Sequence, residues 1–389
     1  MTQKTAGLTE TDKQAIEELR RRLSNELKEV PSHSDDYSLL RWLIGWDYKI
    51  DLIVPKLKHT LTTLAALKLH QADFSSIEKV TEYVNATCTA MSYYPGGIMG
   101  YDKEGNVVAM QPMAKTDPKS LLPTGRLSDM LINRIAESEG IMSLVRANEK
   151  RLNRKLGAIL ICDMEGFNLD LLWMPGMKAY MGLLQVLQEL FPDAVRKVYV
   201  IRAPAAIQIG YNMIYPILAK QTREKVEFLG SDWKEKLHEV ISPEQLFEHW
   251  GGTRSAPTPF GHIRMGGKVP KELRYNPDNN PEEPMPKQLT TVSVSARNFQ
   301  KVVVKVDRAG SCLKWFFRVS SGDVIFSIDH SSGKVIRPVF RLSTEFVPEW
   351  GEMSCELPGE YTLTFDNSHG KLWSKEIKYR VQVIAPNKD

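Results

Sequence analysis

The chain has 389 residues, of which 42% are hydrophobic and 25% are charged; this composition is typical of soluble globular proteins, and the length favours two or three domains. A net charge of +4 permits weak attraction to anionic membranes but does not indicate a nucleic-acid-binding protein. The sequence has no apolar run of about 18 residues, no signal-peptide core near its start and no CxxC motif among its four cysteines, so we expect a cytosolic protein with free thiols and no membrane span.

The first 70 or so residues show the spacing of amphipathic helices. Thr11 and Gln14 stand at capping-box spacing. The helix that follows has apolar residues on one face, at Ile16, Leu19, Leu23 and Leu27. Further helices are expected over residues 39–46, after the acidic pair at 35–36, and from about Asp51. Together these segments predict a small antiparallel helical unit.

After about Phe74 the pattern changes to strands alternating with helices. The turn Asp102–Gly105 between two apolar runs predicts a β-hairpin. Helices are expected at residues 77–86, 128–154, 175–190 and 208–219, and buried strands at residues 157–163 and from residue 197. Strands separated by helices predict a largely parallel sheet with helices packed on it.

Prolines and glycines punctuate residues 253–287, which we expect to form a linker that lies on a surface, so residues up to about Pro259 should fold alone. Strand patterns follow at residues 301–306, 313–319, 324–329, 360–366 and 375–383. The last alternates most clearly, with Ile377, Tyr379, Val381 and Val383 on one face and Lys378, Arg380 and Gln382 on the other. The spacing of these segments favours a β-sandwich.

Signals for catalysis or metal binding are weak. The sequence has no GxSxG, P-loop or HExxH motif, and its eight histidines are scattered, so we predict no metal site. The run Gly96–Gly100 precedes a strand instead of opening a helix, which favours a tight entry into the hairpin over a phosphate-binding loop.

The acids Asp163 and Glu165 and the basic run Arg20–Arg22 each allow two interpretations. Asp163 and Glu165 follow a strand, where α/β enzymes often place catalytic acids, but a hydrolase would also need a nucleophile or a metal. The alternative is that Asp163 caps the following turn and Glu165 pairs with a nearby base. Arg20–Arg22 on the first helix read as a solvated face, with contact to anionic lipid headgroups as the alternative.

The segment Ala205–Ala219, AAIQIGYNMIYPILA, is apolar nearly all round and has Pro216 near its end. One interpretation is a fully buried helix. The other is a lid whose inner face covers an apolar cavity and whose outer face meets a membrane. Periodicity alone does not separate the two.

Long segments of the chain resemble CRAL-TRIO proteins, in the correct order and spacing. The matching segments are DDYSLLRWL, GAILICDMEGFNLDLLW, QELFPDAVRKVYVIRAPAAIQIGYNMIYPIL, TREKVEFLGSDWKEKL and ISPEQLFEHWGG. The segments LKWFFRVSSGDVIFSI and GEYTLTFDNSHGKLWSKEIKYRVQV look like a GOLD domain. This combination resembles the subgroup of supernatant protein factor and tocopherol-associated protein.

The resemblance implies a multidomain fold. Its expected parts are an N-terminal α-helical unit (residues 1–75), an α/β CRAL-TRIO lobe with one apolar pocket (76–254), a Pro/Gly-rich linker (255–274) and an all-β GOLD sandwich (275–384). Ligands of the family include phosphatidylinositol, phosphatidylcholine, tocopherol, squalene and retinoid-like lipids. A mobile helix gates the pocket; here the gate and pocket wall would be Ile209, Tyr211, Met213, Ile214, Ile217 and Leu218.

The phosphoinositide-binding pattern of the family is only half present. Thr222 and Lys225 match two of its headgroup contacts, whereas Ile44 stands in place of an arginine and Gly182 in place of a glutamate. The resemblance therefore implies poor binding of phosphatidylinositol and a less polar ligand, such as an isoprenoid, unless a neighbouring base such as Arg41 or Lys49 takes over the phosphate.

The expected function is therefore to bind one hydrophobic lipid in a gated pocket and to transfer or present it, without catalysis and without a cofactor other than the lipid. Expected partners are the lipid, a transient membrane surface and a protein that contacts the GOLD domain, and the expected location is the cytoplasm with transient association to Golgi or other endomembranes. Two alternatives are an adaptor whose pocket is structural and a hydrolase that uses Asp163 and Glu165.

Overall fold

The computed structural model describes residues 7–386, and the contacts among them divide the chain into two compact units. The first unit contains the chain up to Leu121 together with residues 132–269. The second contains residues 122–131 together with the chain from Pro270 onward. A short segment from the middle of the sequence thus belongs to the second unit.

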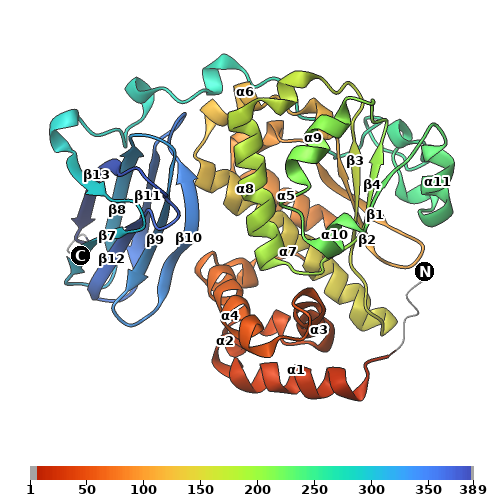
Figure 1. Ribbon diagram of the computed structural model, residues 1–389, viewed down its shortest axis with the longest axis horizontal. Helices are drawn as coiled ribbons and strands as arrows, with labels where there is room; N and C mark the ends of the chain where they lie inside the picture. The colour runs from red at the N-terminus through yellow and green to blue at the C-terminus, as the bar shows by residue number, and fades with distance from the viewer. Residues whose placement is uncertain (1–6, 387–389) are drawn as a thin grey trace. The chain divides into compact units, whose positions relative to one another are not determined.

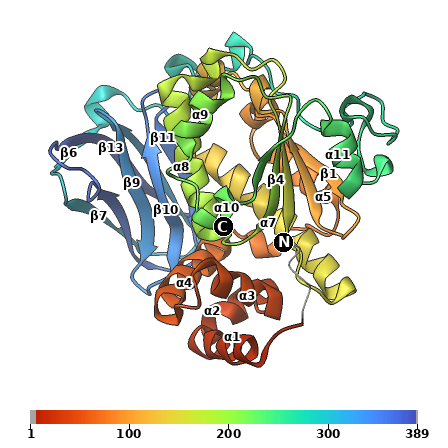
Figure 2. The same cartoon turned by 45° about the vertical axis from the view of Figure 1, so that its right-hand side comes forward.

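The N-terminal helices form one group within the first unit (Figures 1 and 2). They are α1 (Glu10–Arg22), α2 (Ser24–Glu29), α3 (Asp36–Gly45) and α4 (Ile50–Ala66). The predicted apolar face of α1 lies in their shared core, where Ile16 and Leu19 pack with Leu39, Leu43 and Leu57. The predicted group of N-terminal helices is confirmed.

The helix α1 begins at Glu10 with Thr9 as its N-cap, so the capping box predicted at Thr11 and Gln14 is wrong. Thr9 Oγ1 accepts a hydrogen bond from Asp12 N at 3.1 Å, and the Asp12 carboxylate accepts one from Thr9 N at 2.8 Å. Asp12 also accepts a hydrogen bond from the Tyr48 hydroxyl at 2.6 Å. This tertiary contact and the carboxylate charge beside the helix N-terminus favour Asp12 as the reciprocal residue.

The central sheet of the first unit has the strand order β1-β2-β3-β4-β5 within the described residues. Its strands are β1 (Gly97–Tyr101), β2 (Val107–Gln111), β3 (Ala158–Asp163), β4 (Val195–Ile201) and β5 (Val226–Phe228). The first pair is antiparallel and forms the predicted hairpin, whereas β2 to β5 run parallel. Both the hairpin and the largely parallel sheet are confirmed.

Helices connect these strands and pack on the sheet (Figure 1). They are α5 (Ile77–Thr87), α6 (Pro118–Leu121), α7 (Leu127–Leu152), α8 (Met174–Leu190), α9 (Ile207–Ile214), α10 (Lys220–Arg223) and α11 (Trp233–Val240). The helix predicted at residues 208–219 ends earlier, at Ile214. Pro216 follows this end, and because its nitrogen carries no hydrogen the chain continues as a turn.

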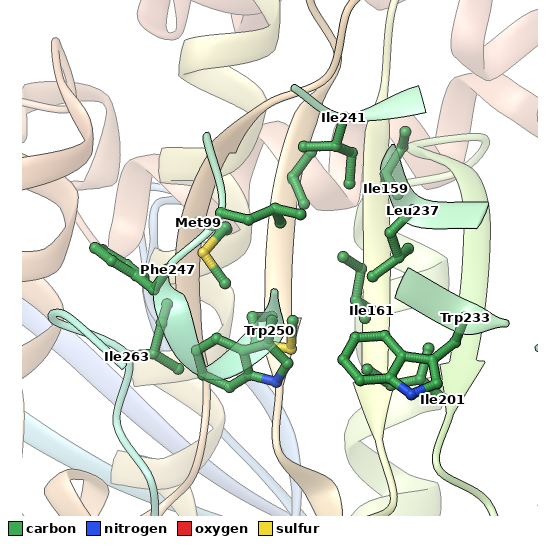
Figure 3. Packing of buried hydrophobic residues seen from close by; sticks show 13 residues of the cluster. Met99, Ile159, Ile161, Ile201, Trp233, Leu237, Ile241, Phe247, Trp250 and Ile263 are labelled. Atoms are coloured by element: carbon green, nitrogen blue, oxygen red, sulfur yellow. The ribbon is translucent and has the colours of Figure 1, made fainter. Parts of the chain in front are cut away.

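One face of the sheet carries a dense core (Figure 3). Ile159 and Ile161 of β3 pack there against Trp233 and Leu237 of α11 and against Trp250. Residues beyond the expected end of the lobe contribute to the same core. They include Ile263, with Phe260 and Met265 partly buried beside it. The first unit therefore continues to Val269. A truncated protein that keeps the whole core should end after Val269 and not after Pro259.

The second unit is a β-sandwich of two antiparallel four-stranded sheets between residues 290 and 384 (Figures 1 and 2). The strands are β6 (Thr290–Val294), β7 (Phe299–Val306), β8 (Ser311–Val319), β9 (Asp323–His330), β10 (Val335–Ser343), β11 (Glu349–Cys355), β12 (Gly359–Asp366) and β13 (Lys375–Ile384). Their orders are β10-β9-β12-β7 and β11-β8-β13-β6. Phe317, Phe326 and Phe365 form the aromatic centre, with ring centroids 4.8 to 5.4 Å apart.

The five predicted strands of the sandwich are confirmed, but β6, β10 and β11 were not predicted. Each of these three lies at the edge of its sheet. Edge strands are less constrained in sequence, and β10 contains Pro338, which an inner strand would not accept.

Candidate functional site

The two faces of the central sheet differ in how tightly they are covered. On β3, Ile159 and Ile161 are 4% and 0% exposed and belong to the dense core. Leu160 and Cys162 alternate with them and point to the second face, yet they are only half-buried although β3 is the central strand. Ile207 of α9 packs on this second face. The elements that cover the second face therefore leave part of it open.

Side chains near this second face lie deep in the protein and still keep accessible surface. Burial raises the pKa of the Cys162 thiol to about 12 and raises the pKa of Tyr180, on α8, well above its ordinary value. Burial also raises the pKa of Tyr94. All three residues are nevertheless only half-buried by accessible surface. The second face of the sheet is therefore less tightly packed than the face that carries Ile159 and Ile161.

A charged cluster lies near Tyr94 and Tyr180, around Arg134 of α7. The Arg134 guanidinium pairs with Glu137, and its Cζ lies 4.9 Å from the centroid of the Tyr94 ring. Glu137 also pairs with Arg264 at 2.7 Å, so two guanidinium groups share one carboxylate. Burial lowers the pKa of both arginines to about 10. Arg134 Nη1 is buried and has no hydrogen-bond partner within residues 7–386. The cluster is thus a buried site with excess positive charge and an unpaired donor.

The segment from α9 to Leu218 is partly exposed, which contradicts the interpretation as a fully buried helix. Ile209 and Tyr215 are 55% and 44% exposed. The Tyr211 ring packs edge-to-face on Tyr215 and on Phe228 of β5, with centroids 5.7 and 5.3 Å apart. The other predicted gate residues are more enclosed: Met213, Ile214 and Ile217 are half-buried and Leu218 is buried. The segment therefore presents apolar side chains both inward and outward.

The end of this segment is held to α8 by one side chain. Gln188 Nε2 donates hydrogen bonds to the carbonyl oxygens of Ile217, at 3.2 Å, and Leu184, at 3.1 Å. Gln188 Oε1 accepts a hydrogen bond from Ala219 N at 2.6 Å. Two of these bonds cross from α8 to the segment, so Gln188 fixes the point where the chain leaves α9 for α10. No feature of the sequence singled out this residue.

The two expected headgroup contacts, Thr222 and Lys225, lie on and just after α10, whereas the two departures from the phosphoinositide pattern lie on α3 (Ile44) and on α8 (Gly182). Lys225 Nζ donates to Asp193 Oδ1 at 2.8 Å and to the Val195 carbonyl oxygen at 2.6 Å, and Asp193 also pairs with Lys155 at 2.6 Å, so two lysines share one carboxylate. Thr222 is half-buried on α10. Ile44 is half-buried. A Cβ added at Gly182 would meet nothing within 4 Å, so there is room for a side chain at that position.

The two bases suggested as substitutes for the missing arginine are also engaged. Arg41 is buried and pairs with Glu149. Lys49 Nζ lies 3.7 Å from Asp47 in an exposed pair. Arg41 Nε and Nη1 are buried and have no hydrogen-bond partner within residues 7–386, so the alternative that Arg41 takes over a lipid phosphate stays a prediction.

The acids at the end of β3 form a closed structural cluster. Asp163 Oδ1 accepts hydrogen bonds from Glu165 N at 3.0 Å and from Arg202 Nε at 2.9 Å, and Asp163 Oδ2 accepts one from Trp250 Nε1 at 3.0 Å. Arg202 Nη1 lies 2.8 Å from Glu165 Oε1. Asp163 caps the turn and Glu165 pairs with a base, which confirms the structural interpretation. His249 joins the two acids in a group of possible metal ligands, but the Arg202 guanidinium already supplies the positive charge there.

The basic run of α1 is likewise paired with acids. Its ion pairs are Arg20 with Glu17 and Asp36, Arg21 with Glu18, and Arg22 with Glu18 and Asp51. These pairs fit the solvated face predicted for this run. Such exposed pairs each contribute little to stability.

Comparisons with known proteins agree with this fold. Residues 91–252 match the family of the CRAL/TRIO domain, and this stretch contains the whole central sheet with α7, α8 and α9. The match and the fold assign residues 91–252 to the CRAL/TRIO domain family. Among residues 7–386, no helix is both long and apolar enough to cross a bilayer.

Two proteins of Caenorhabditis elegans are similar in sequence. Protein ctg-1 is 25% identical over 396 aligned positions, which cover 97% of this chain and 98% of that protein. A protein named for its CRAL-TRIO domain is 26% identical over 322 positions, which cover 79% of this chain and 42% of that longer protein. The crystal structure of Sfh5 is similar with 14% identity and a TM-score of 0.43, and the similarity covers 59% of this chain and 83% of Sfh5.

Proposed function

We propose that the protein holds one hydrophobic lipid in the pocket beneath α9 and transfers or presents it to membranes or partner proteins. The observation that carries the proposal is the accessible surface of Tyr94, Cys162 and Tyr180 deep inside the first unit, beside a segment that is apolar on both sides. In this proposal the segment is the gate, and its pocket wall includes Met213, Ile214, Ile217 and Leu218.

The physical chemistry of lipid transport explains why such a pocket needs a gate. Each lipid CH₂ exposed to water costs about 0.8 kcal/mol, so one long chain costs on the order of 10 kcal/mol. A carrier must therefore enclose the chain almost completely, and it must open to exchange it. Ile209 and Tyr215 provide apolar surface on the outer side of the gate, where contact with a membrane would take place.

The charged cluster narrows the class of lipid. Arg134 Nη1 and the shared carboxylate of Glu137 leave one positive charge incompletely compensated next to an otherwise apolar pocket. A ligand with a long hydrocarbon part and a single polar or anionic oxygen group would satisfy that donor. Arg134 Nη1 is itself covered, so the oxygen would reach it after a rotation of a neighbouring side chain such as Tyr94.

Phosphatidylinositol is the ligand that the proposal disfavours. Ile44 and Gly182 lack the groups that would bind its headgroup, and Lys225 is paired with Asp193. The double variant Ile44→Arg with Gly182→Glu should gain transfer of labelled phosphatidylinositol, because Gly182 has room for the new side chain. Efficient transfer of phosphatidylinositol by the wild type would contradict this part of the proposal.

Charged substitutions in the gate segment test whether it must enter an apolar environment for lipid to exchange. Ile214→Asp with Ile217→Asp should abolish exchange of a fluorescent lipid between liposomes, because a carboxylate is costly in hydrocarbon. Leu52→Asp adds one carboxylate at a surface position on α4 that is 42% exposed and should leave exchange unchanged. A folded double variant that exchanges lipid at the wild-type rate would refute the gate.

For the second unit we propose a GOLD domain at residues 275–384 that contacts a protein partner, with the protein located in the cytoplasm and transiently at endomembranes. The sandwich of two four-stranded sheets in the described residues supports this assignment. The alternative function is an adaptor in which the lipid is a permanent structural component. A carrier exchanges its lipid with liposomes, whereas an adaptor keeps the same lipid.

A further inference from the structure

The connection between β12 and β13 exposes two large apolar side chains to water. Within this connection, which we call the Trp373 loop (residues 367–374), Leu372 is 80% exposed and Trp373 is 81% exposed. Isolated apolar residues on a surface are common, but two adjacent large ones with this exposure are a sizeable apolar projection. Tryptophan is also the residue most costly to leave in water at such a position.

The loop is held in place by one buried side chain. Asn367 is 0% exposed, and its Nδ2 donates to the carbonyl oxygens of Val294 and Trp373, both at 3.1 Å. The Asn367 backbone donates to Asn298 at 2.9 Å and accepts from Arg297 at 3.0 Å. These bonds tie the loop to the connection between β6 and β7. The exposed pair is therefore presented by an ordered loop and does not depend on local disorder.

A third apolar side chain and two cations lie at the same end of the sandwich. Phe299, at the start of β7, is 51% exposed and is paired in the sheet with Asp366, immediately before the Trp373 loop. Arg297 and Lys371 are exposed, and neither takes part in an ion pair within the part of the chain that the structure describes. This end thus combines exposed aromatic and aliphatic surface with free positive charge.

We propose that the Trp373 loop, with Phe299 beside it, docks the sandwich on an anionic lipid bilayer. Tryptophan prefers the boundary between hydrocarbon and headgroups, where its ring is buried and its N–H remains hydrated. Lysine and arginine beside it are attracted to anionic headgroups. This proposal goes beyond the lipid-carrying function, which requires membrane contact only at the gate and gives the sandwich a protein partner.

The test is sedimentation of the full chain with vesicles of phosphatidylcholine alone or mixed with phosphatidylserine. The variant Leu372→Ser with Trp373→Ser should bind the mixed vesicles at least about 10-fold more weakly than the wild type, because it removes most of the exposed apolar projection. Arg297→Gln with Lys371→Gln should reduce the preference for mixed vesicles and leave the weaker binding to phosphatidylcholine nearly unchanged.

A matched control is Leu357→Ser, which removes an apolar side chain that is 42% exposed in the connection between β11 and β12. This control should bind vesicles as the wild type does. Circular dichroism checks that each variant is folded. We expect folding to be retained because the replaced side chains are exposed. Equal vesicle binding by the wild type and the Leu372–Trp373 variant overturns the proposal. A wild type that binds neither kind of vesicle also overturns it. Either result would favour a protein partner for the loop.

The lipid bound to each variant is measured by native mass spectrometry, so the docking proposal and the pocket proposal fail separately. A variant that loses vesicle docking but keeps its bound lipid tests only the proposal for the Trp373 loop. A protein that docks on vesicles but carries no bound lipid contradicts only the proposal for the pocket.

Discussion

The contact between Gln188 and the gate gives the most specific prediction for lipid exchange. Gln188→Met keeps the length of the side chain but removes its hydrogen bonds to Ile217 O and from Ala219 N. Each such bond contributes about 0.5–1.5 kcal/mol, and because Ala219 is exposed and can bond to water when the gate opens, the lower part of this range applies. A loss of about 1–2 kcal/mol from the closed state would increase gate opening about 5- to 30-fold.

The assay is stopped-flow transfer of a fluorescent lipid from donor to acceptor liposomes. If opening limits the rate, the Gln188→Met protein exchanges lipid about 5- to 30-fold faster than the wild type. Gln185→Met, one turn away on the exposed side of α8, is the matched control and should exchange at the wild-type rate. A Gln188→Met protein that is folded and exchanges no faster than the control would show that these bonds do not hold the gate.

Further predictions concern the buried charges of the first unit. Arg134→Met should weaken the binding of a lipid with an anionic end about 10-fold or more, as measured by ligand titration. Binding of the uncharged ester of the same lipid should stay nearly unchanged. The variant should fold because Glu137 keeps its pair with Arg264. Burial alone would raise the pKa of Glu139, but Arg146 and His33 outweigh it and lower the pKa to about 2. Ionised Glu139 therefore stabilises the fold above its unfolded pKa near 4.5, and this contribution of about 3 kcal/mol is lost as the pH falls from about 4.5 to 2. Glu139→Gln should flatten the pH dependence of urea unfolding in that window, and an unchanged slope would exclude this assignment.

Much of the fold was predictable because its strands and helices carry strong local patterns. The inner strands of both units are rich in apolar and β-branched residues, and α1 repeats its apolar residues at helical spacing. The edge strands β6, β10 and β11 were missed because β6 is short, β10 is interrupted by Pro338 and β11 places Gly351 among polar residues. The gate helix was predicted to run through Pro216, although proline disfavours continuation of a helix.

The open face of the sheet, where we propose the pocket, was harder to predict than the fold. The strand AILICD is apolar on both faces, so its sequence does not distinguish the packed side of Ile159 and Ile161 from the open side of Leu160 and Cys162. Arg134 lies on a helix with many charged residues, where a solvated position is the usual expectation. Only the folded chain brings it to Tyr94.

Native mass spectrometry of the full-length protein tests the central claim most directly. The account predicts that the protein emerges with one lipid bound per chain, that denaturation releases this lipid, and that incubation with liposomes of another lipid replaces it. A protein that emerges without a lipid, and that stays so after incubation with liposomes, would contradict the account.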